Sequence, residues 1–181
     1  MARYRFGVGE YRYFSEPLPS NVQAMRESAY PPLAAIANRW EAALKTRVRH
    51  PPNLAGLQAL CARRGQKKPT PLLLRYDTGG YNCLHQDLYG EVVFPIQLTV
   101  LLSEPGRDFE GGEFLLVEQR SRAQSRGSVV RLEQGEAVIF TTRFRPSVGG
   151  RGHHRVNMRH GVSRVLSGER YTLGVIFHNA A

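Results

Sequence analysis

Residues 72–87 read LLLRYDTGGYNCLHQD, and this stretch decides the fold expected of the chain. Two β-rich runs, 71–77 and 82–87, flank a Gly-Gly turn signal, a pattern that is typical of paired strands. If His85 and Asp87 lie on the second strand, its period of two turns both side chains to the same side, while Gln86 points away. One short strand then supplies an imidazole and a carboxylate to one site.

The β-rich character continues to the end of the chain. Further runs, separated by glycine- and proline-containing turns, cover residues 92–103, 113–119, 128–132, 136–142, 153–157, 161–165 and 170–178. Many short strands without intervening helices indicate a sandwich, a barrel or a jelly roll.

The front of the chain is predicted to be mainly helical. One helix is expected over 31–46, with Pro31-Pro32 at its entrance and an apolar stripe made of Leu33, Ile36, Ala37, Trp40, Ala43 and Leu44. A short helix from Ser20 to about Tyr30 should precede it, because Ser20 can cap and Pro31 discourages continuation. A third is expected from Asn53 to Gly65. The 181 residues fit one domain, in which residues 1–68 support a core formed by 69–181.

His160, far downstream, completes a possible metal site with His85 and Asp87. Two imidazoles and one carboxylate occupy one face of an octahedral metal and leave positions open, which suits Fe(II) that must also bind a cosubstrate and O2. Arg170 offers a fork for a carboxylate and Tyr76 adds a phenol donor. The residues therefore indicate an oxygenase with an acidic cosubstrate. The competing histidines are His153, His154 and His178.

Four segments together resemble the Fe(II)- and 2-oxoglutarate-dependent dioxygenases: LLLRYDTGGYNCLHQD, DFEGGEF at 108–114, GEAVIF at 135–140 and RHGVSRVLSGERYTLGVIFH at 159–178. The tyrosine, the Leu-His-Gln-Asp and the late Arg-Tyr-x-Leu resemble the AlkB-type enzymes, which oxidatively demethylate damaged nucleic acid. The closest likeness is to a bacterial family described as oxygenases of that kind, and it covers nearly the whole chain.

This resemblance implies a mainly β (α+β) fold, a double-stranded β-helix of the jelly-roll type with supporting N-terminal helices. It implies that His85, Asp87 and His160 are iron ligands and catalytic residues. Arg170 would form a salt bridge with the distal carboxylate of 2-oxoglutarate, and Tyr76 would hydrogen-bond that carboxylate. AlkB-type enzymes place a second arginine six residues after the first, where this chain has Ile176.

The implied cofactors are Fe(II), 2-oxoglutarate as cosubstrate, and O2. The expected reaction is oxidative demethylation of alkylated nucleic acid, which releases succinate, CO2 and formaldehyde. Hydroxylation of a protein side chain, as in prolyl hydroxylases, uses the same cofactors and is the alternative. A non-catalytic jelly roll that binds nucleic acid is a third interpretation.

Charge favours a polyanionic partner such as DNA or RNA, and a genome-wide bias toward arginine codons is the alternative explanation of the surplus. The formal net charge is +10, and among 25 basic residues only Lys45, Lys67 and Lys68 are lysine. Two arginine-rich segments, one with Arg120, Arg122, Arg126 and Arg131 and one with Arg143, Arg145, Arg151, Arg155 and Arg159, could bind phosphates. A solvated face balanced by Glu110, Glu113 and Glu118 is the alternative.

The N-terminal segment and the two cysteines allow further expectations. Arg3, Arg5 and Arg12 alternate with Tyr4, Phe6, Tyr11, Tyr13 and Phe14, which could stack bases or form an ordinary edge strand. Cys61 and Cys83 describe no disulfide framework, and neither a membrane span nor a signal peptide is evident. A cytoplasmic protein is expected. Cys83 could line the metal pocket or, as a small hydrophobe, be buried.

Overall fold

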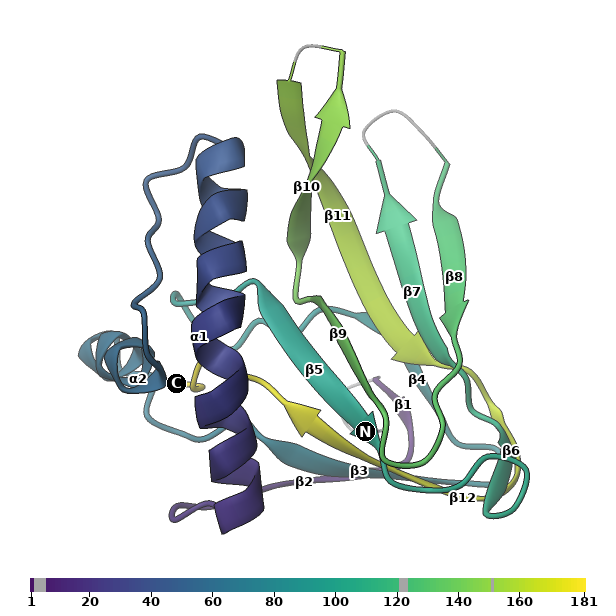
Figure 1. The fold of residues 1–181 in the computed structure, drawn as a ribbon. Helices are drawn as coiled ribbons and strands as arrows, with labels where there is room; N and C mark the ends of the chain where they lie inside the picture. The colour runs from purple at the N-terminus through teal and green to yellow at the C-terminus, as the bar shows by residue number, and fades with distance from the viewer. Residues whose placement is uncertain (2–5, 121–123, 151) are drawn as a thin grey trace.

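The computed structural model describes residues 1, 6–120, 124–150 and 152–181, so the expectations for Arg3, Tyr4, Arg5, Arg122 and Arg151 lie outside the described residues. Two antiparallel sheets carry the fold, and two helices flank one of them (Figure 1). The prediction of a mainly β jelly roll with supporting N-terminal helices is confirmed.

One sheet, called here the hairpin sheet, has the order β1-β4-β11-β7-β8, and β10 also pairs with β11. Its strands are β1 (Gly7–Val8), β4 (Tyr81–His85), β7 (Phe114–Gln119), β8 (Arg126–Val130), β10 (Phe144–Gly149) and β11 (Gly152–Val162). The β7–β8 and β10–β11 hairpins project beyond the body of the molecule (Figure 1).

The other sheet, the helix-covered sheet, has the order β2-β3-β12-β5-β9, with β6 paired to β12. Its strands are β2 (Glu10–Tyr13), β3 (Leu72–Asp77), β5 (Ile96–Leu101), β6 (Phe109–Gly111), β9 (Ala137–Thr141) and β12 (Val165–Val175). Side chains alternate along these strands, so one face packs on the helices and the other faces the interior of the jelly roll.

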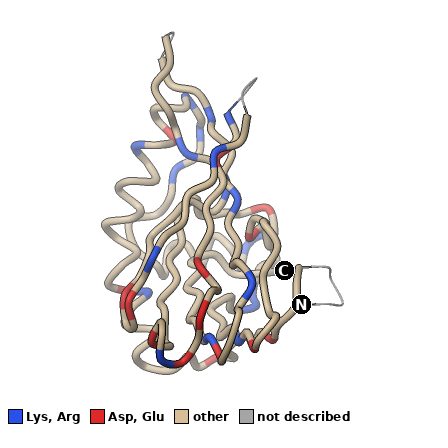
Figure 2. The backbone as a smooth tube through the Cα atoms, turned by 90° about the vertical axis from the view of Figure 1, so that its right-hand side faces the viewer, with Lys and Arg blue, Asp and Glu red and all other residues tan. Residues whose placement is uncertain are grey.

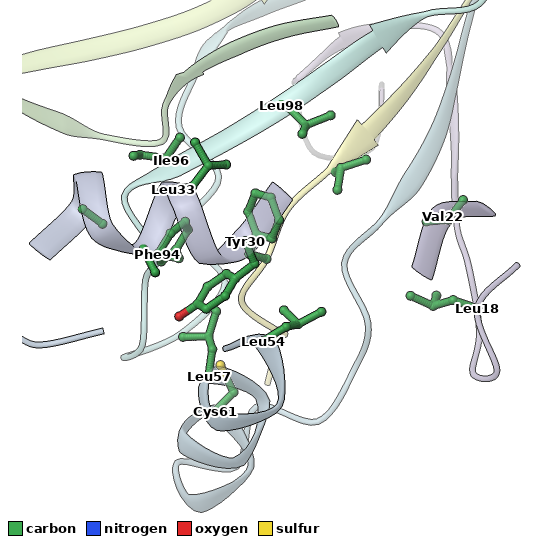
Figure 3. Close-up of a cluster of buried hydrophobic side chains, with 14 of the residues drawn as sticks. Leu18, Val22, Tyr30, Leu33, Leu54, Leu57, Cys61, Phe94, Ile96 and Leu98 are labelled. Atoms are coloured by element: carbon green, nitrogen blue, oxygen red, sulfur yellow. The ribbon is translucent and has the colours of Figure 1, made fainter. Parts of the chain in front are cut away.

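The helices pack on this sheet through a continuous apolar core. Tyr30 and Leu33 of α1 (Ser20–Ala43) and Leu57 of α2 (Leu54–Arg63) share one cluster with Phe94 and Leu98 (Figure 3). Burying a side chain of this size contributes roughly 1.5–3 kcal/mol. The expected stripe is confirmed at Leu33 and Ala37, which are buried, and at Ile36 and Trp40, which are partly buried against the core. The helices therefore support the sheet that forms one wall of the interior.

The first two expected helices are in fact one, which corrects the prediction of a break at Pro31. Helix α1 runs from Ser20 to Ala43 and contains Pro31 and Pro32. A proline inside a helix removes a hydrogen bond and costs about 3 kcal/mol, but packing of the flanking turns against the sheet compensates. Ser20 is not the cap, because Pro19 holds that position and no side chain caps the helix.

Helix α2, Leu54–Arg63, agrees with the sequence. The Asn53 side chain accepts a hydrogen bond from the Gly56 backbone N–H at 2.9 Å, as expected of a capping residue. Gly65 follows with a φ of 78°, the left-handed conformation that ends a helix.

The largest errors concern the last strands. Residues 152–162 form one strand, not two runs separated near His160, and the strand expected to begin at residue 170 begins at Val165. Strands β10 and β6 were not predicted.

Tyr11 and Tyr13 lie on β2, which pairs with β3 at the edge of the sheet, as the edge-strand interpretation of the N-terminal segment proposed. Among the helices of the described ranges, none combines the length and apolar character that a membrane span needs.

Candidate metal and cosubstrate site

The two candidate histidine ligands face each other across adjacent strands. His85 ends β4 and is the direct antiparallel partner of His160 on β11, with ring centroids 4.2 Å apart. The pairing shifts register between His160 and Val162. At that point a Cβ on Gly161 would lie 2.6 Å from the Asn82 carbonyl oxygen, so only glycine lets the strands approach so closely. Direct pairing places both imidazoles on one face.

Asp87 reaches the same point, although not from a strand. Strand β4 ends at His85, so the premise that His85 and Asp87 share one strand is wrong. Asp87 lies in the irregular segment that follows, where its carboxylate oxygens stand 3.5 Å from His85 Nε2 and 3.2 Å from His160 Nε2. Gln86 donates to Met158 O at 2.7 Å, which ties this segment to β11.

The three side chains form a compact donor cluster. One ligand atom from each of His85, Asp87 and His160 lies within 4.8 Å of the others. Burial alone would raise the pKa of Asp87, but the adjacent His160 and His85 hold it well below its ordinary value. Burial lowers the pKa of His160, which favours the neutral imidazole that a metal requires. Two imidazoles and an ionised carboxylate fit Fe(II).

Each oxygen of Asp87 also accepts a hydrogen bond from a neutral donor. Tyr89 Oη donates to Oδ1 at 2.8 Å, and Gln97 Nε2 donates to Oδ2 at 2.9 Å. Tyr13 Oη in turn donates to Tyr89 Oη at 3.3 Å. These contacts fix the orientation of the carboxylate. Sequence reasoning missed both donors of Asp87; for Gln97 the available signal was an amide side chain in a mainly apolar run.

Arg170 and Tyr76 are direct partners on β12 and β3 and lie 2% and 1% exposed. The guanidinium carbon is 5.7 Å from the Tyr76 ring centroid. Nε and Nη1 of Arg170 are buried without a hydrogen-bond partner. Burial lowers the pKa of Arg170 to about 10, and burial raises that of Tyr76 to about 12. A buried cation with unpaired donors is costly, and an anionic ligand would satisfy it.

A cavity of about 160 Å3 joins the His–Asp–His cluster to the Arg170–Tyr76 pair. All five predicted site residues, Tyr76, His85, Asp87, His160 and Arg170, line it together. Ile176, which stands where AlkB-type enzymes place a second arginine, lines the same cavity and is 3% exposed. The wall at that position is therefore apolar.

Aromatic side chains surround the cavity on the side of β2. The Tyr13 ring contacts Tyr11 and Tyr89 edge to face, with centroids 5.5 Å and 6.3 Å away. Phe6 contacts the His85 ring at 5.5 Å. All four residues line the cavity, so a substrate there would meet aromatic rings.

The other candidate site residues do not line the cavity. His153 and His154 are exposed on β11, where they pair with Val148 and Ser147 of the β10–β11 hairpin. His178 is fully buried, and its Nδ1 accepts a hydrogen bond from the Phe94 backbone N–H at 3.3 Å. Cys83 is exposed and does not line the cavity, so neither of its expected roles holds.

Comparison with known proteins also indicates an oxygenase. A family model for oxygenases, described as catalysing oxidative methylation of damaged DNA, matches residues 9–180. Two uncharacterized proteins of Mycobacterium tuberculosis, from strains CDC 1551 / Oshkosh and H37Rv, are each 46% identical over 182 residues, covering 98% of this chain and 78% of the relative. The expected oxygenase activity and family are confirmed.

A solved structure shares the fold. A Pseudomonas putida prolyl-4-hydroxylase aligns over 99% of this chain and 77% of its own, with a TM-score of 0.54 and 15% identity. An oxidoreductase of the 2OG-Fe(II) oxygenase family from Burkholderia pseudomallei aligns over 61% of this chain and 43% of its own, with a TM-score of 0.43 and 20% identity. The expected cofactors, Fe(II), 2-oxoglutarate and O2, agree with an oxygenase family and with the His–Asp–His cluster.

Proposed function

Because the chain belongs to this family of oxygenases, we propose that it is an Fe(II)- and 2-oxoglutarate-dependent dioxygenase that oxidatively demethylates alkylated nucleic acid. One observation carries the cofactor assignment: the cavity that holds the His–Asp–His cluster also holds Arg170, a buried cation with unpaired donors. Metal ligands and an anion-binding group in one small cavity match a cosubstrate that is both a metal chelator and a carboxylate.

The side chains divide the work between two ends of the cavity. His85, Asp87 and His160 would hold iron, while Tyr89 and Gln97 keep the Asp87 carboxylate oriented. Arg170 would pair with the distal carboxylate of 2-oxoglutarate, to which Tyr76 can also donate. Bound iron with 2-oxoglutarate and O2 supplies the oxidant, and the protein positions the target carbon and limits water.

The family description favours damaged DNA as the substrate, and the net charge of +10 favours a polyanionic partner. Demethylation is the reaction that we propose for a methylated base. One oxygen atom of O2 enters a C–H bond of an N-methyl group, and the other enters succinate as 2-oxoglutarate loses CO2. The resulting N–CH2OH then breaks its N–C bond to release formaldehyde and restore the N–H.

Formaldehyde and succinate should appear in equal amounts when the protein is incubated with iron, ascorbate, 2-oxoglutarate and single-stranded DNA or RNA that carries methylated bases. The Asp87→Ala variant is the control, since loss of a ligand should abolish both products. Absence of formaldehyde across a panel of methylated bases, with succinate still formed, would reject demethylation and keep the cofactor assignment. Unchanged activity of Asp87→Ala would reject the metal site.

Hydroxylation of a protein side chain is the second candidate. The observation in its favour is that Ile176 stands where AlkB-type enzymes place a second arginine. Arg170 is therefore the sole arginine of the described cavity lining. It predicts a stable product 16 Da heavier, without formaldehyde, when peptides containing proline are supplied. Mass spectrometry of both substrate types in one experiment separates the two reactions.

We also propose that residues 1–181 act as one domain, in which residues 1–68 support a jelly-roll core formed by 69–181. A cytoplasmic location is supported by Cys61 and Cys83, which are both free thiols.

A further inference from the structure

A buried glutamate joins the two projecting hairpins. Glu118, near the end of β7, is 5% exposed and pairs with three arginines. Arg120 Nε lies 2.6 Å from Oε1 and Arg126 Nη2 lies 3.4 Å from Oε2, and Arg145 on β10 pairs with Oε2 as well. Arg120, Arg126 and Arg145, with Glu118, are called here the arginine cluster.

This cluster lies on the same face of the hairpin sheet as the metal ligands. Leu116 pairs with His160, and two residues further along β7, Glu118 pairs with Met158 of β11 and Arg126 of β8. Directly paired residues project to the same face, and alternate residues of one strand share it. Two residues along a strand span roughly 7 Å. The arginine cluster therefore extends the face that carries His160.

One carboxylate cannot neutralise three guanidinium groups. The side chains of Arg120, Arg126 and Arg145 are 47%, 68% and 30% exposed, so they keep donors that face solvent. Residues 119–132 and 143–160 contain no acidic residue. Basic positions, all of them arginine, recur along both projecting hairpins (Figure 2). The hairpins therefore form a positively charged surface whose central side chains are held in place by Glu118.

The base of the β10–β11 hairpin adds a cation–aromatic stack. The guanidinium carbon of Arg143 lies 4.4 Å from the Phe144 ring centroid, and that of Arg155 lies 5.5 Å from it. Phe144 and Arg155 alternate with Arg145 and Val156 along their strands, so this stack lies on the opposite face of the hairpin and both faces carry arginine.

We propose that the arginine cluster binds the phosphodiester backbone of a nucleic acid whose target base enters the cavity. This inference rests on the proposed function and deepens it by naming the surface that holds the substrate. Guanidinium groups bind phosphate oxygens through paired N–H donors, and Glu118 limits the side-chain freedom that binding would otherwise remove. Phosphate contacts supply affinity without sequence choice.

Binding of a fluorescent single-stranded 15-mer to the full chain, followed by anisotropy over a range of salt concentrations, tests the proposal. Arg126→Gln removes the most exposed member of the cluster and leaves Glu118 two partners. Its affinity should fall several-fold, and the slope of log K against log salt should decrease by roughly 0.7, because one phosphate of the strand is no longer neutralised. Arg39→Gln removes the same charge from an exposed position on α1 and should change neither the affinity nor the slope beyond a small non-specific effect.

Equal behaviour of Arg126→Gln and Arg39→Gln would overturn the proposal. A polyglutamate peptide of matched charge that binds as tightly, with the same weakening in Arg126→Gln, would overturn the assignment to nucleic acid. Binding is measured without iron or 2-oxoglutarate on an unmethylated oligonucleotide, so it is independent of turnover. Weaker binding by Arg126→Gln supports the surface even if no methylated base yields formaldehyde, a result that would reject only demethylation.

Discussion

Arg26 and Arg170 are both buried arginines, but they lie in two different regions of the molecule. Arg26 on α1 is 0% exposed, and its Nη2 donates to the Phe177 carbonyl oxygen at 2.8 Å between helix and sheet. Arg170 lines the cavity inside the jelly roll. Burial lowers the pKa of each to about 10, and each retains unpaired donors. Burial of a cation by itself therefore does not identify a binding site, and it is the position of Arg170 beside the cavity that favours one.

Arg170→Met should produce the largest effect on the proposed site. Loss of a buried charged partner typically costs about 2–5 kcal/mol, so the Kd for 2-oxoglutarate should rise by roughly 30-fold to several thousand-fold. Calorimetry with Mn(II) in place of iron would measure it, and the affinity for Mn(II) alone should not change. Thermal stability should not fall, because an apolar side chain replaces an unpaired buried charge.

Arg26→Met is the matched substitution in the other region. It leaves the Phe177 carbonyl without its donor, so the free energy of unfolding should fall by about 1–3 kcal/mol. Binding of 2-oxoglutarate should remain as in the wild type. If the two variants weakened 2-oxoglutarate binding equally, the distinction between a structural and a ligand-binding arginine would be lost.

Tyr89→Phe should have the next largest effect, on metal affinity. It removes one hydroxyl, the donor to Asp87 Oδ1, and the loss of such a supporting hydrogen bond typically costs 10–100-fold in metal affinity. Titration with Mn(II) or Co(II) measures it without turnover. Tyr13→Phe removes the outer hydroxyl of the same chain and should change the affinity little. A smaller loss in Tyr89→Phe than in Tyr13→Phe would contradict the role given to Tyr89.

Gly112→Ala should weaken 2-oxoglutarate binding by displacing Arg170. A Cβ at Gly112 would lie 2.8 Å from Arg170 Cδ, so we expect a loss of about tenfold, less than in Arg170→Met. Gly106→Ala is the control, because its φ of 79° imposes similar backbone strain while nothing lies within 4 Å of the added carbon. Comparable losses in both variants would attribute the effect to strain and not to Arg170.

Sequence reasoning could identify side chains that belong to local motifs, but not contacts that depend on how distant segments pack. The five site residues could be predicted, because each is a distinctive side chain in a local motif, and the structure brings all five to one cavity. Tyr89 and Gln97 could not, since a donor to Asp87 is defined only by how distant strands meet. Continuity of α1 through Pro31 also depends on packing, which offsets a local penalty that the sequence shows plainly. The path of β11 through His160 depends on pairing with both β4 and β7.

The smallest effect is expected at Glu118. Its arginine partners are exposed and paired, whereas Arg26 and Arg170 are buried and retain unpaired donors. The hydrogen bond from Arg120 holds the pKa of Glu118 below its ordinary value of 4.5, so ionised Glu118 stabilises the fold at neutral pH. Glu118→Gln should therefore lower the melting temperature at pH 7 by about 2–4 °C. Because a carboxyl group with a lowered pKa loses its contribution as the pH falls through that pKa, the difference from wild type should shrink below pH 4.5. Thermal melts of both proteins from pH 7 to pH 3 would show this convergence, and a difference that stays constant over that range would mean that the charge of Glu118 does not hold the hairpins together.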